Sequence, residues 1–304
     1  MPRFSVIVPC FNAAATLADT LQALRDQHLQ DWEALLIDDG STDATVAILE
    51  AAAAADSRFR VLQNIGKGPS AARNLGLAKA LGEIVAFCDA DDIWEAEKLA
   101  CLARTFDADD VDGCYARIAF FDGDQSRTTS QIAAGDLTIP VLLGENPVCT
   151  MSNLALKREV ALASGGLDES MVHNEDLEWL IRLVGEGHRI TGIDRVLVRY
   201  RTSVTGLSSD LSAMQAGRET ALRTAERFGF TSEPKADAIH LRYLARRALR
   251  VGAPPKVALG LALQGLRLSP RGWFSNARRG ALVLGGVIAA PLMPMALRRV
   301  LFSY

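Results

Sequence analysis

Short apolar runs alternate with helix-favouring segments through the first hundred residues of the chain. Four of these runs predict β-strands: residues 4–9, 34–37, 59–63 and 83–88. A helix with three leucines on one face follows the potential N-cap Asn12, and residues 45–55 and 70–81 also favour helix. Strands that alternate with helices at this spacing predict an α/β fold, with a mostly parallel sheet covered by helices on both faces.

After residue 110 the alternation becomes less regular. Residues 112–121 and 151–156 predict further strands, and the polar, glycine-containing residues 122–136 predict a surface loop. Residues 173–176 begin a predicted helix with a buried face, and residues 196–201 predict a last strand. Three segments beyond it predict helices, the last two as a hairpin around Pro254 and Pro255: residues 211–228, 236–251 and 257–268.

Three carboxylates crowd the end of the predicted strand 83–88. Asp89, Asp91 and Asp92 lie where open α/β sheets bind their ligands, and like charges so close together favour a bound cation. Oxygen ligands suggest Mg²⁺ or Mn²⁺, which one or two protein carboxylates usually hold together with substrate phosphates. The pattern therefore predicts a site for a nucleotide diphosphate, with a solvated acidic loop as the alternative.

A second pair of acids, Asp38 and Asp39, follows the predicted strand 34–37. Carboxylates there can accept hydrogen bonds from a ribose or a base, although a helix-capping turn explains them equally. The glycine turn at residues 66–68 has neither the Walker spacing nor the GxGxxG pattern. Arg73, in the first turns of the next predicted helix, favours an anion there.

Six short motifs occur in one order along residues 4–205: VIVPCFN, DDGSTD, GPSAARNLG, FCDADDIW, GGLDES and NEDLEW. Together they resemble glycosyltransferase family 2, whose members are inverting enzymes with the GT-A fold. The resemblance implies a nucleotide-sugar donor bound by the first half, a divalent metal on the DXD-type acids, and an acceptor bound by the second half. The QxxRW motif of processive synthases does not occur, which favours transfer of a single sugar.

The resemblance also implies roles for individual residues. It places Pro9, Phe11 and Asn12 at the border of the nucleotide, Asp39 with Asp38 at the base or ribose, Arg73 near the nucleotide, Asp89 at the sugar or ribose, and Asp91 on the metal. In the segment 202–209, which in relatives often folds over the donor diphosphate, Ser208 or the preceding Arg201 is expected to complete the phosphate site.

Inverting transfer requires one carboxylate to take a proton from the acceptor hydroxyl. The match to the ED motif of the family makes Asp176 the expected base and Glu175 its supporting residue. The alternative is that two acids at a helix start merely complement the helix dipole. His173, a loop histidine in the same motif, is given no catalytic role.

Charge divides the chain unevenly. All 36 Asp and Glu precede residue 238, whereas eleven of the 33 Lys and Arg follow it, so residues 1–237 carry about −14 and residues 238–304 about +11. The basic part suggests an anionic surface as partner, and the sequence has no nucleic-acid-binding motif to favour DNA or RNA.

The basic part ends in an uncharged run, residues 280–297. As a straight helix it would reach about 27 Å, short of a bilayer core of roughly 30 Å. We therefore expect an anchor in the membrane interface, with Trp273, Phe274 and the flanking arginines at the level of the headgroups. The alternative is a C-terminal helix buried in the fold or in a dimer contact.

Cysteine usage and the start of the chain bear on location. The five cysteines show no CxxC pairing, which predicts reduced thiols, and no apolar leader precedes Phe4. We expect a cytoplasmic protein, peripheral on the cytoplasmic face of the inner membrane. The expected organisation is a GT-A catalytic domain at 1–209, with a donor half at 1–110 and an acceptor half at 111–209, then a helical extension at 210–270 and a membrane-associating tail at 271–304.

Two other functions remain open at this stage. A sugar nucleotidyltransferase would need an N-terminal glycine-rich loop with basic residues, which VIVPCFN does not provide. A non-catalytic protein that binds nucleotide sugars or organises a membrane would have no use for a base such as Asp176 beside a metal ligand such as Asp91. The expected function is metal-dependent transfer of one sugar to a glycan or lipid-linked glycan in cell-surface polysaccharide synthesis.

Overall fold

The computed structural model describes residues 1–108, 110–122, 125–202 and 210–302. The chain forms two compact units. The first contains residues 1–137 and 147–201, and the second contains residues 138–146 together with the chain from residue 202 onward. Residues 138–146 thus leave the first unit and return to it.

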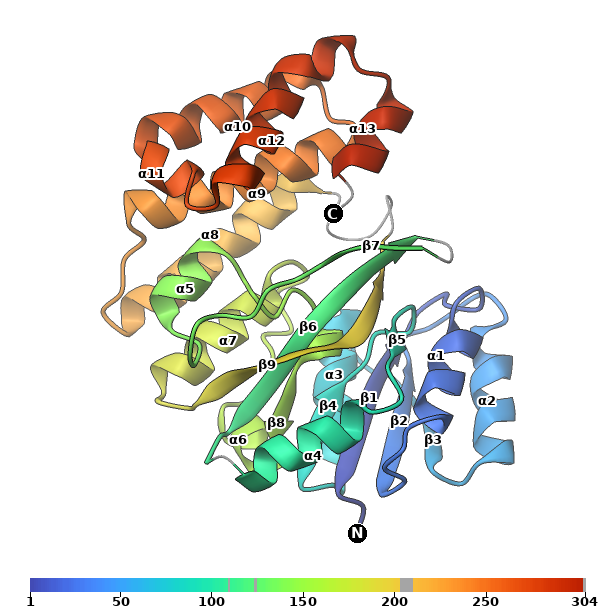
Figure 1. Ribbon diagram of the computed structural model, residues 1–304. Helices are drawn as coiled ribbons and strands as arrows, with labels where there is room; N and C mark the ends of the chain where they lie inside the picture. Colours follow the sequence, from blue (N-terminus) through green and yellow to red (C-terminus); the bar gives the residue numbers. More distant parts are fainter. Residues whose placement is uncertain (109, 123–124, 203–209, 303–304) are drawn as a thin grey trace. The chain divides into compact units, whose positions relative to one another are not determined.

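A single mixed sheet runs through the first unit (Figure 1). Its parallel part consists of β1 (Phe4–Cys10), β2 (Trp32–Asp38), β3 (Phe59–Gln63) and β4 (Ile84–Phe87), in the spatial order β3-β2-β1-β4. β1 pairs in parallel with both β2 and β4. The four predicted strands and their parallel pairing are therefore confirmed.

Helices cover both faces of this parallel part. They are α1 (Leu17–Arg25), α2 (Thr45–Ala55), α3 (Gly68–Lys79) and α4 (Lys98–Ala108), with α4 in front of the sheet and α3 behind it in Figure 1. Val6 and Val8 share one buried cluster with Leu21 of α1. Ile7 points to the other face, where a Cβ added at Gly76 of α3 would lie 2.5 Å from its Cγ2.

The prediction that Asn12 caps the first helix is wrong. α1 begins at Leu17, and Thr16 occupies the N-cap position. Asn12 adopts a left-handed backbone conformation, with φ of 47°, and its side chain bonds to the loop after β2 instead. Four residues separate it from the helix, and its side chain joins the loops after β1 and β2 at the edge of the sheet.

The other half of the sheet contains β5 (Ile93–Trp94), β6 (Gly113–Asp122), β7 (Gln125–Thr129), β8 (Ala155–Lys157) and β9 (Ile190–Arg201). β8 runs antiparallel to β4 and β6, and the long strands β6 and β9 are parallel. The predicted loop at 122–136 is partly wrong, because β7 pairs with β6 in a hairpin. Its polar residues gave no strand signal, and only the pairing with β6 identifies this strand.

The predicted strand at 151–156 is also only partly correct. Met151–Asn153 form a 3₁₀ turn, and the strand β8 begins after it, at Ala155. The amide of Asn153 fixes this turn by donating to the carbonyl oxygens of Ala116 and Val148. Two short helices complete the first unit, α6 (Arg158–Ala163) and α7 (Glu175–Gly185).

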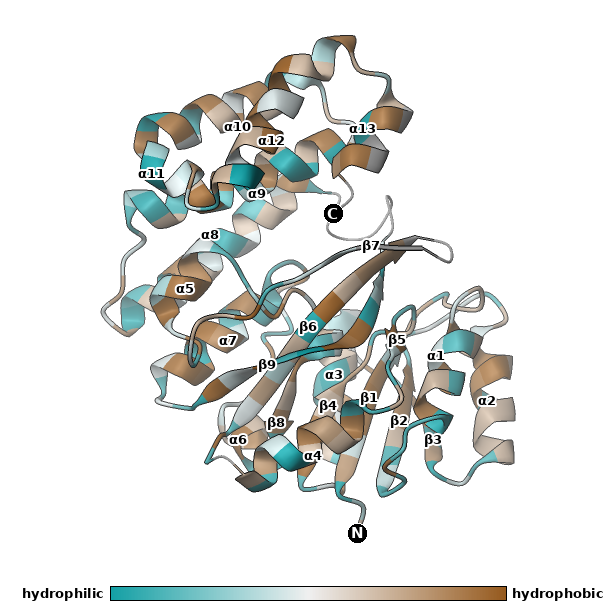
Figure 2. Ribbon diagram, in the orientation of Figure 1, coloured by the Kyte–Doolittle hydropathy of each residue, from teal (hydrophilic) through white to brown (hydrophobic). Residues whose placement is uncertain are grey.

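The second unit is helical. It contains α5 (Ile139–Gly144), α8 (Leu211–Arg227), α9 (Pro234–Val251), α10 (Pro255–Leu268), α11 (Pro270–Trp273), α12 (Ala277–Ala289) and α13 (Met295–Phe302), with a 3₁₀ turn at Ala290–Leu292. α9 and α10 pack against each other on either side of Pro254, which confirms the predicted hairpin. Figure 2 shows hydrophobic residues along α10 and α12.

Trp273 is not at a membrane interface, contrary to the prediction. Its side chain is fully buried in one cluster with Leu249 of α9, Ala262 of α10 and Val287 of α12. The segment 271–304 therefore shares a hydrophobic core with the helices that precede it. Within the described parts of the chain, every helix is too short or too polar to cross a bilayer.

Candidate active site

The loops that follow β1 and β2 are joined through Asn12. Its Oδ1 accepts a hydrogen bond from the N–H of Thr42 at 2.8 Å, and its own N–H donates to Ser41 Oγ at 3.0 Å. Pro9 lies near the end of β1, and the ring of Phe11 is 60% exposed. An exposed aromatic ring at the carboxyl edge of a sheet offers a surface on which a nucleobase can stack.

The two acids after β2 have different environments. Asp38 is buried, and its carboxylate accepts from the N–H groups of Gly40 and Ser41 and from the amide of Gln63. Burial alone would raise the pKa of Asp38, but these hydrogen bonds outweigh it and lower the pKa. The geometry thus favours the turn-capping alternative for Asp38, because its oxygens already have partners within its own turn.

Asp39 reaches across to the glycine turn before α3. Its Oδ1 accepts from Asn64 Nδ2 at 2.5 Å, and its Oδ2 accepts from the N–H of Gly68 at 2.9 Å. Gly68 has a φ of 85°, which a residue with a Cβ rarely adopts. Asp39 remains partly exposed, so of the two acids it is the one with surface available to a ligand.

Arg73 lies at the centre of the site. It is 5% exposed, and its guanidinium forms ion pairs with Asp89 at 2.7 Å and with Glu175 at 3.1 Å. Burial by itself would lower the pKa of Arg73, but the charges of Asp89, Glu175 and Asp176 raise it. The resemblance placed Arg73 near the nucleotide, whereas the structure shows it joining the acid after β4 to the start of α7.

Asp89 is held from three directions. Besides Arg73, its Oδ2 accepts a hydrogen bond from Thr150 Oγ1 at 2.9 Å, and its N–H donates to Ser152 Oγ at 2.7 Å. Sequence reasoning missed Thr150 and Ser152. The short polar stretch CTMSN carried no motif, and only the packing of its 3₁₀ turn against β4 shows that these hydroxyls orient the acid.

The next two acids lie against Arg201. The Nε of Arg201 donates to the carbonyl oxygen of Asp91, its backbone N–H donates to Asp92 Oδ1, and its Nη2 pairs with Asp19, each at 3.0 Å. Burial and the negative charge of Asp89 raise the pKa of Asp91 to about 6. Arg201 therefore holds the backbone of the acidic loop in place. Ser208, the other residue expected at the phosphate site, lies outside the described residues.

Asp176 begins α7 next to Glu175. Its Oδ1 accepts from the N–H of Leu177 at 2.8 Å. Burial, and after it the charge of Glu175, raises the pKa of Asp176 to about 7. A carboxyl group with a pKa near neutrality can both accept and release a proton under physiological conditions. The structure thus brings Asp89, Arg73, Glu175 and Asp176 together, as residues of one electrostatic group.

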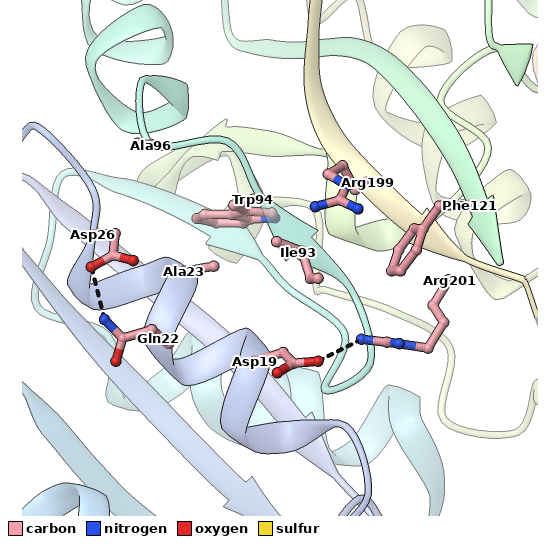
Figure 3. A pocket seen from close by; sticks show the side chains of 10 residues that line it. All are labelled: Asp19, Gln22, Ala23, Asp26, Ile93, Trp94, Ala96, Phe121, Arg199 and Arg201. Atoms are coloured by element: carbon pink, nitrogen blue, oxygen red, sulfur yellow. Dashed lines mark hydrogen bonds and ion pairs between the residues drawn. The ribbon is translucent and has the colours of Figure 1, made fainter. Parts of the chain in front are cut away.

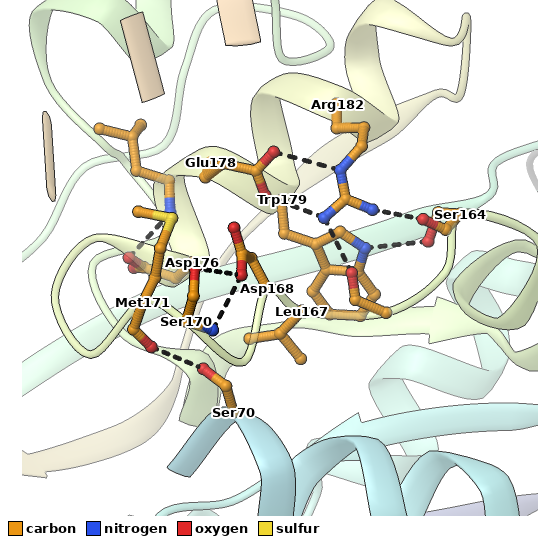
Figure 4. A network of polar contacts seen from close by, with 12 residues as sticks. Ser70, Ser164, Leu167, Asp168, Ser170, Met171, Asp176, Glu178, Trp179 and Arg182 are labelled. Atoms are coloured by element: carbon orange, nitrogen blue, oxygen red, sulfur yellow. Dashed lines mark hydrogen bonds and ion pairs between the residues drawn. The ribbon is translucent and has the colours of Figure 1, made fainter. Parts of the chain in front are cut away.

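The glycine turn GGLDES is positioned from α3. Asn74 accepts from the N–H of Leu167 and donates to its carbonyl oxygen, both at 2.9 Å, and a Cβ at Gly166 would lie 2.5 Å from Asn74 Oδ1. Figure 4 shows the adjoining network, in which Arg182 of α7 bonds to Glu178 and to the turn. The turn is therefore fixed between α3 and α7 rather than free.

A cavity of about 450 Å³ lies beside the acidic loop (Figure 3). It is lined by Asp19, Gln22, Ala23, Asp26, Ile93, Trp94, Ala96, Phe121, Arg199 and Arg201. Arg199 and Arg201 each lie 4.8 Å from the centre of the Phe121 ring, and Arg201 extends toward Asp19. Asp39, Arg73 and Asp176 do not line it, so this cavity is separate from the cluster around Arg73.

Comparison with known proteins identifies the family of the chain. The model of the family described as Glycosyl transferase family 2 matches residues 5–163, which include nearly all of β1, the strands from β2 to β8, Arg73 on α3, and the loops that carry Asp39, Asp89 and Asp91. The chain belongs to this family. It is a glycosyltransferase, and the alternative of a non-enzymatic scaffold loses its support.

Two relatives and one solved structure extend the comparison. The chain is 27% identical to the uncharacterized glycosyltransferase alr2836 of Nostoc over 86% of this chain and 80% of that protein. It is 29% identical, over 68% and 79%, to the Escherichia coli UDP-Glc:alpha-D-GlcNAc-diphosphoundecaprenol beta-1,3-glucosyltransferase WfgD. The mannosyltransferase PcManGT from Pyrobaculum calidifontis, solved with GDP-Man and Mn²⁺, matches with a TM-score of 0.61 at 20% identity, over 99% and 85%. This likeness confirms the predicted GT-A fold.

The acids of this glycosyltransferase suit a shared metal better than a metal held by protein alone. Among the described residues, no three His, Cys, Asp or Glu side chains are grouped as a metal site. Asp91, however, is a partly buried carboxyl group that is repelled by Asp89, and a cation would offset that repulsion. Mg²⁺ and Mn²⁺ commonly bind through one or two carboxylates and complete their coordination with substrate phosphates, so the residues present fit such an ion.

The ion pairs of Arg73 lead to a stability prediction. In Arg73→Gln, the carboxylates of Asp89 and Glu175 lose their counter-charge in a poorly solvated site, and we expect the free energy of unfolding to fall by about 3 kcal/mol. Urea denaturation would measure it. Arg195→Gln is the matched control: its pair with Glu97 is exposed, and the expected loss is below about 1 kcal/mol. Equal losses in both variants would contradict the central role of Arg73.

Proposed function

We propose that this glycosyltransferase transfers one sugar, with inversion, from a nucleotide-diphosphate sugar to a hydroxyl of a glycan or lipid-linked glycan in cell-surface polysaccharide synthesis. The observation that carries the proposal is the contact of Arg73 with both Asp89 and Glu175. This contact brings Asp89, which is expected to bind the donor, close to Glu175 and Asp176, which are expected to act on the acceptor.

The proposed chemistry assigns a separate task to each residue. The carboxylate of Asp176 takes the proton from the acceptor hydroxyl, whose oxygen attacks the anomeric carbon from the face opposite the diphosphate. The bond between that carbon and the phosphate oxygen then breaks, and the nucleoside diphosphate leaves. Asp91 would hold a divalent ion, which when bound offsets the negative charge of the leaving diphosphate. Asp39 and the ring of Phe11 bind the nucleoside part.

Named relatives support the choice of substrates. The name of WfgD gives UDP-Glc as donor and a sugar linked to diphosphoundecaprenol as acceptor. PcManGT was solved with GDP-Man and Mn²⁺. Both donors are nucleotide-diphosphate sugars, which is the class that the acidic loops of this chain are proposed to bind. The proposed metal is Mn²⁺ or Mg²⁺.

The first test concerns the base. Asp176→Asn keeps the size of the side chain and its bond from Leu177 but cannot take a proton, so we expect sugar transfer to fall by about 10²-fold or more while donor affinity stays nearly constant. Glu186→Gln, which removes an exposed acid at the other end of α7, is the control and should transfer normally. Transfer at the wild-type rate by Asp176→Asn would move the role to Glu175.

The same base predicts a pH dependence. Only the ionised carboxylate can accept the proton, and its pKa of about 7 means that kcat/KM should rise with pH through neutrality. Below that pKa the rate should fall about tenfold for each pH unit. A profile that is flat across neutral pH in the wild-type enzyme, at saturating metal, would contradict the assignment.

A second test concerns the metal. Asp91→Ala removes the expected ligand together with a carboxyl group that burial already disfavours, so the fold should persist while Mn²⁺-dependent affinity for the donor is lost. Isothermal calorimetry with nucleotide sugars, with and without Mn²⁺, gives the measurement. Asp107→Ala, at an exposed acid paired with Arg3, should bind as the wild type does. Undiminished affinity in Asp91→Ala would exclude this residue as the ligand.

Peripheral attachment to the cytoplasmic face of a membrane is part of the proposal. Residues 238–304 carry only positive charges, and this segment exposes large apolar side chains although its core is buried. Leu282 is 58% exposed, Ile288 69% and Leu292 92%. Exposed apolar groups combined with positive charge bind anionic bilayers, with about 1 kcal/mol from each Lys or Arg near the surface.

Membrane attachment can be tested without disturbing the core. Deletion of residues 271–304 would remove Trp273 from the core, so surface substitutions are the better choice. The triple variant Leu282→Ser, Ile288→Ser and Leu292→Ser should lose sedimentation with phosphatidylglycerol vesicles and still hydrolyse donor. Leu81→Ser with Leu162→Ser removes exposed leucines from the first unit and should sediment as before. Wild-type protein that ignores such vesicles would refute the attachment.

A further inference from the structure

Three arginines of the second unit converge on a small cavity. Arg242 and Arg246 come from α9, and Arg279 comes from the first turn of α12. The cavity has a volume of about 20 Å³, and its remaining lining is Glu145, Tyr243 and Val283. We call these three arginines the arginine cluster.

The positive charge of the arginine cluster exceeds the negative charge beside it. Among the residues that the structure describes, Glu145 is the one acid that lines the cavity; it pairs with Arg279 at 3.0 Å and lies 3.7 Å from Arg242. Arg246 makes no hydrogen bond or ion pair with any residue that the structure describes. Three guanidinium groups thus line the cavity with one carboxylate, which pairs with two of them and is itself 47% exposed.

Burial makes this imbalance costly. The side chain of Arg242 is 6% exposed, and its Nη1 donates to the carbonyl oxygen of Trp273 at 2.7 Å and to Ser275 Oγ at 3.1 Å. Burial lowers the pKa of both Arg242 and Arg246, and the charge of Arg279 lowers each further. Arginine nevertheless stays charged in proteins, so the repulsion persists unless an anion joins the group.

The surroundings of the cavity restrict which anion fits. A space of about 20 Å³ admits a phosphate oxygen but not a sugar or a nucleobase. Guanidinium groups bind phosphate oxygens through paired, charge-assisted hydrogen bonds. Leu282 follows Arg279 by three residues, which places it on a neighbouring part of the α12 surface, and it is 58% exposed. An anion that carries a hydrocarbon chain suits this combination.

We propose that the arginine cluster binds the phosphate group of a membrane lipid, with Leu282 beside the acyl or polyprenyl chain. Two lipids share this chemistry: an anionic phospholipid of the bilayer and a polyprenyl phosphate that carries the acceptor glycan. The anion site depends on the second unit alone. Its assignment to a lipid rests on the membrane attachment proposed above, and neither depends on Asp176 or Asp91.

Free anion binding is tested first. Inorganic phosphate titrated into the full-length protein should saturate a site that shifts the guanidinium resonances of the arginine cluster in NMR. Arg246→Gln should abolish that shift. Arg278→Gln removes the same charge from α12, at an exposed residue that does not line the cavity, and it should leave the shift intact. Binding that both variants retain equally, or no saturable binding in the wild type, would overturn the site.

Vesicle partitioning then identifies the lipid. Arg246→Gln and Arg279→Gln should each weaken partition into phosphatidylglycerol vesicles, or into phosphatidylcholine vesicles doped with polyprenyl phosphate, by more than about tenfold. Arg278→Gln should weaken it by no more than about fivefold, the effect of one surface charge. The vesicle type in which the cluster variants lose more binding than Arg278→Gln identifies the lipid. Equal losses of vesicle binding in all three variants would mean that the cluster acts only as diffuse surface charge. If phosphate binds but neither type of vesicle shows the difference between the variants, the lipid assignment is refuted.

Two controls keep the outcomes separate. Circular dichroism and donor hydrolysis should match the wild type in all three variants, because the arginine cluster is remote in sequence from every proposed catalytic residue. Arg279 is partly exposed, so Arg279→Gln serves if Arg246→Gln fails to fold. Loss of vesicle binding with normal donor hydrolysis supports the lipid site, whereas loss of hydrolysis in Asp176→Asn with normal vesicle binding concerns the transfer reaction only.

Discussion

A buried arginine between carboxylates is the interaction on which the site depends. Asp89 follows a central strand and Glu175 starts a helix about ninety residues later, and without a shared cation their charges would repel each other in a poorly solvated space. Arg73 offsets that repulsion and at the same time contacts the first residue of α7. Asp176, the next residue of α7, thus lies beside this ion pair.

Burial, which leaves the carboxylates beside Arg73 in need of a counter-charge, also changes the pKa values of the neighbouring acids. Asp38 is buried too, but its own turn supplies enough hydrogen bonds to keep its pKa low. Burial, and after it a neighbouring carboxylate, raises the pKa values of Asp91 and Asp176 to about 6 and about 7. Acids of one sheet edge thus differ in pKa because the balance between burial, neighbouring charge and hydrogen bonding differs from one acid to the next.

The second unit also combines buried arginines with apolar residues, but in a helical core instead of a sheet. Its uncharged C-terminal run contributes Val283, Val287 and Ala290 to a helical core around Trp273, while other apolar residues of the run are exposed. Its arginines are held by backbone carbonyls and by few acids, as Arg242 is by Trp273. A unit built in this way carries positive charge and apolar side chains on its surface together, which is the combination that an anionic bilayer attracts.

The sequence alone determined the parallel strands, the acidic loops at their ends and the family, because short apolar runs and local motifs depend only on neighbouring residues. Tertiary structure decided the rest. The contact of Arg73 with Glu175 and the hydroxyls of Thr150 and Ser152 on Asp89 join residues distant in sequence, and no local pattern records them. The pairing of β7 with β6 is local, but the polar sequence of β7 carries no strand pattern. Trp273 was misplaced for the same reason: its sequence neighbours suit a membrane interface equally well, and only packing against α9, α10 and α12 shows that it is buried.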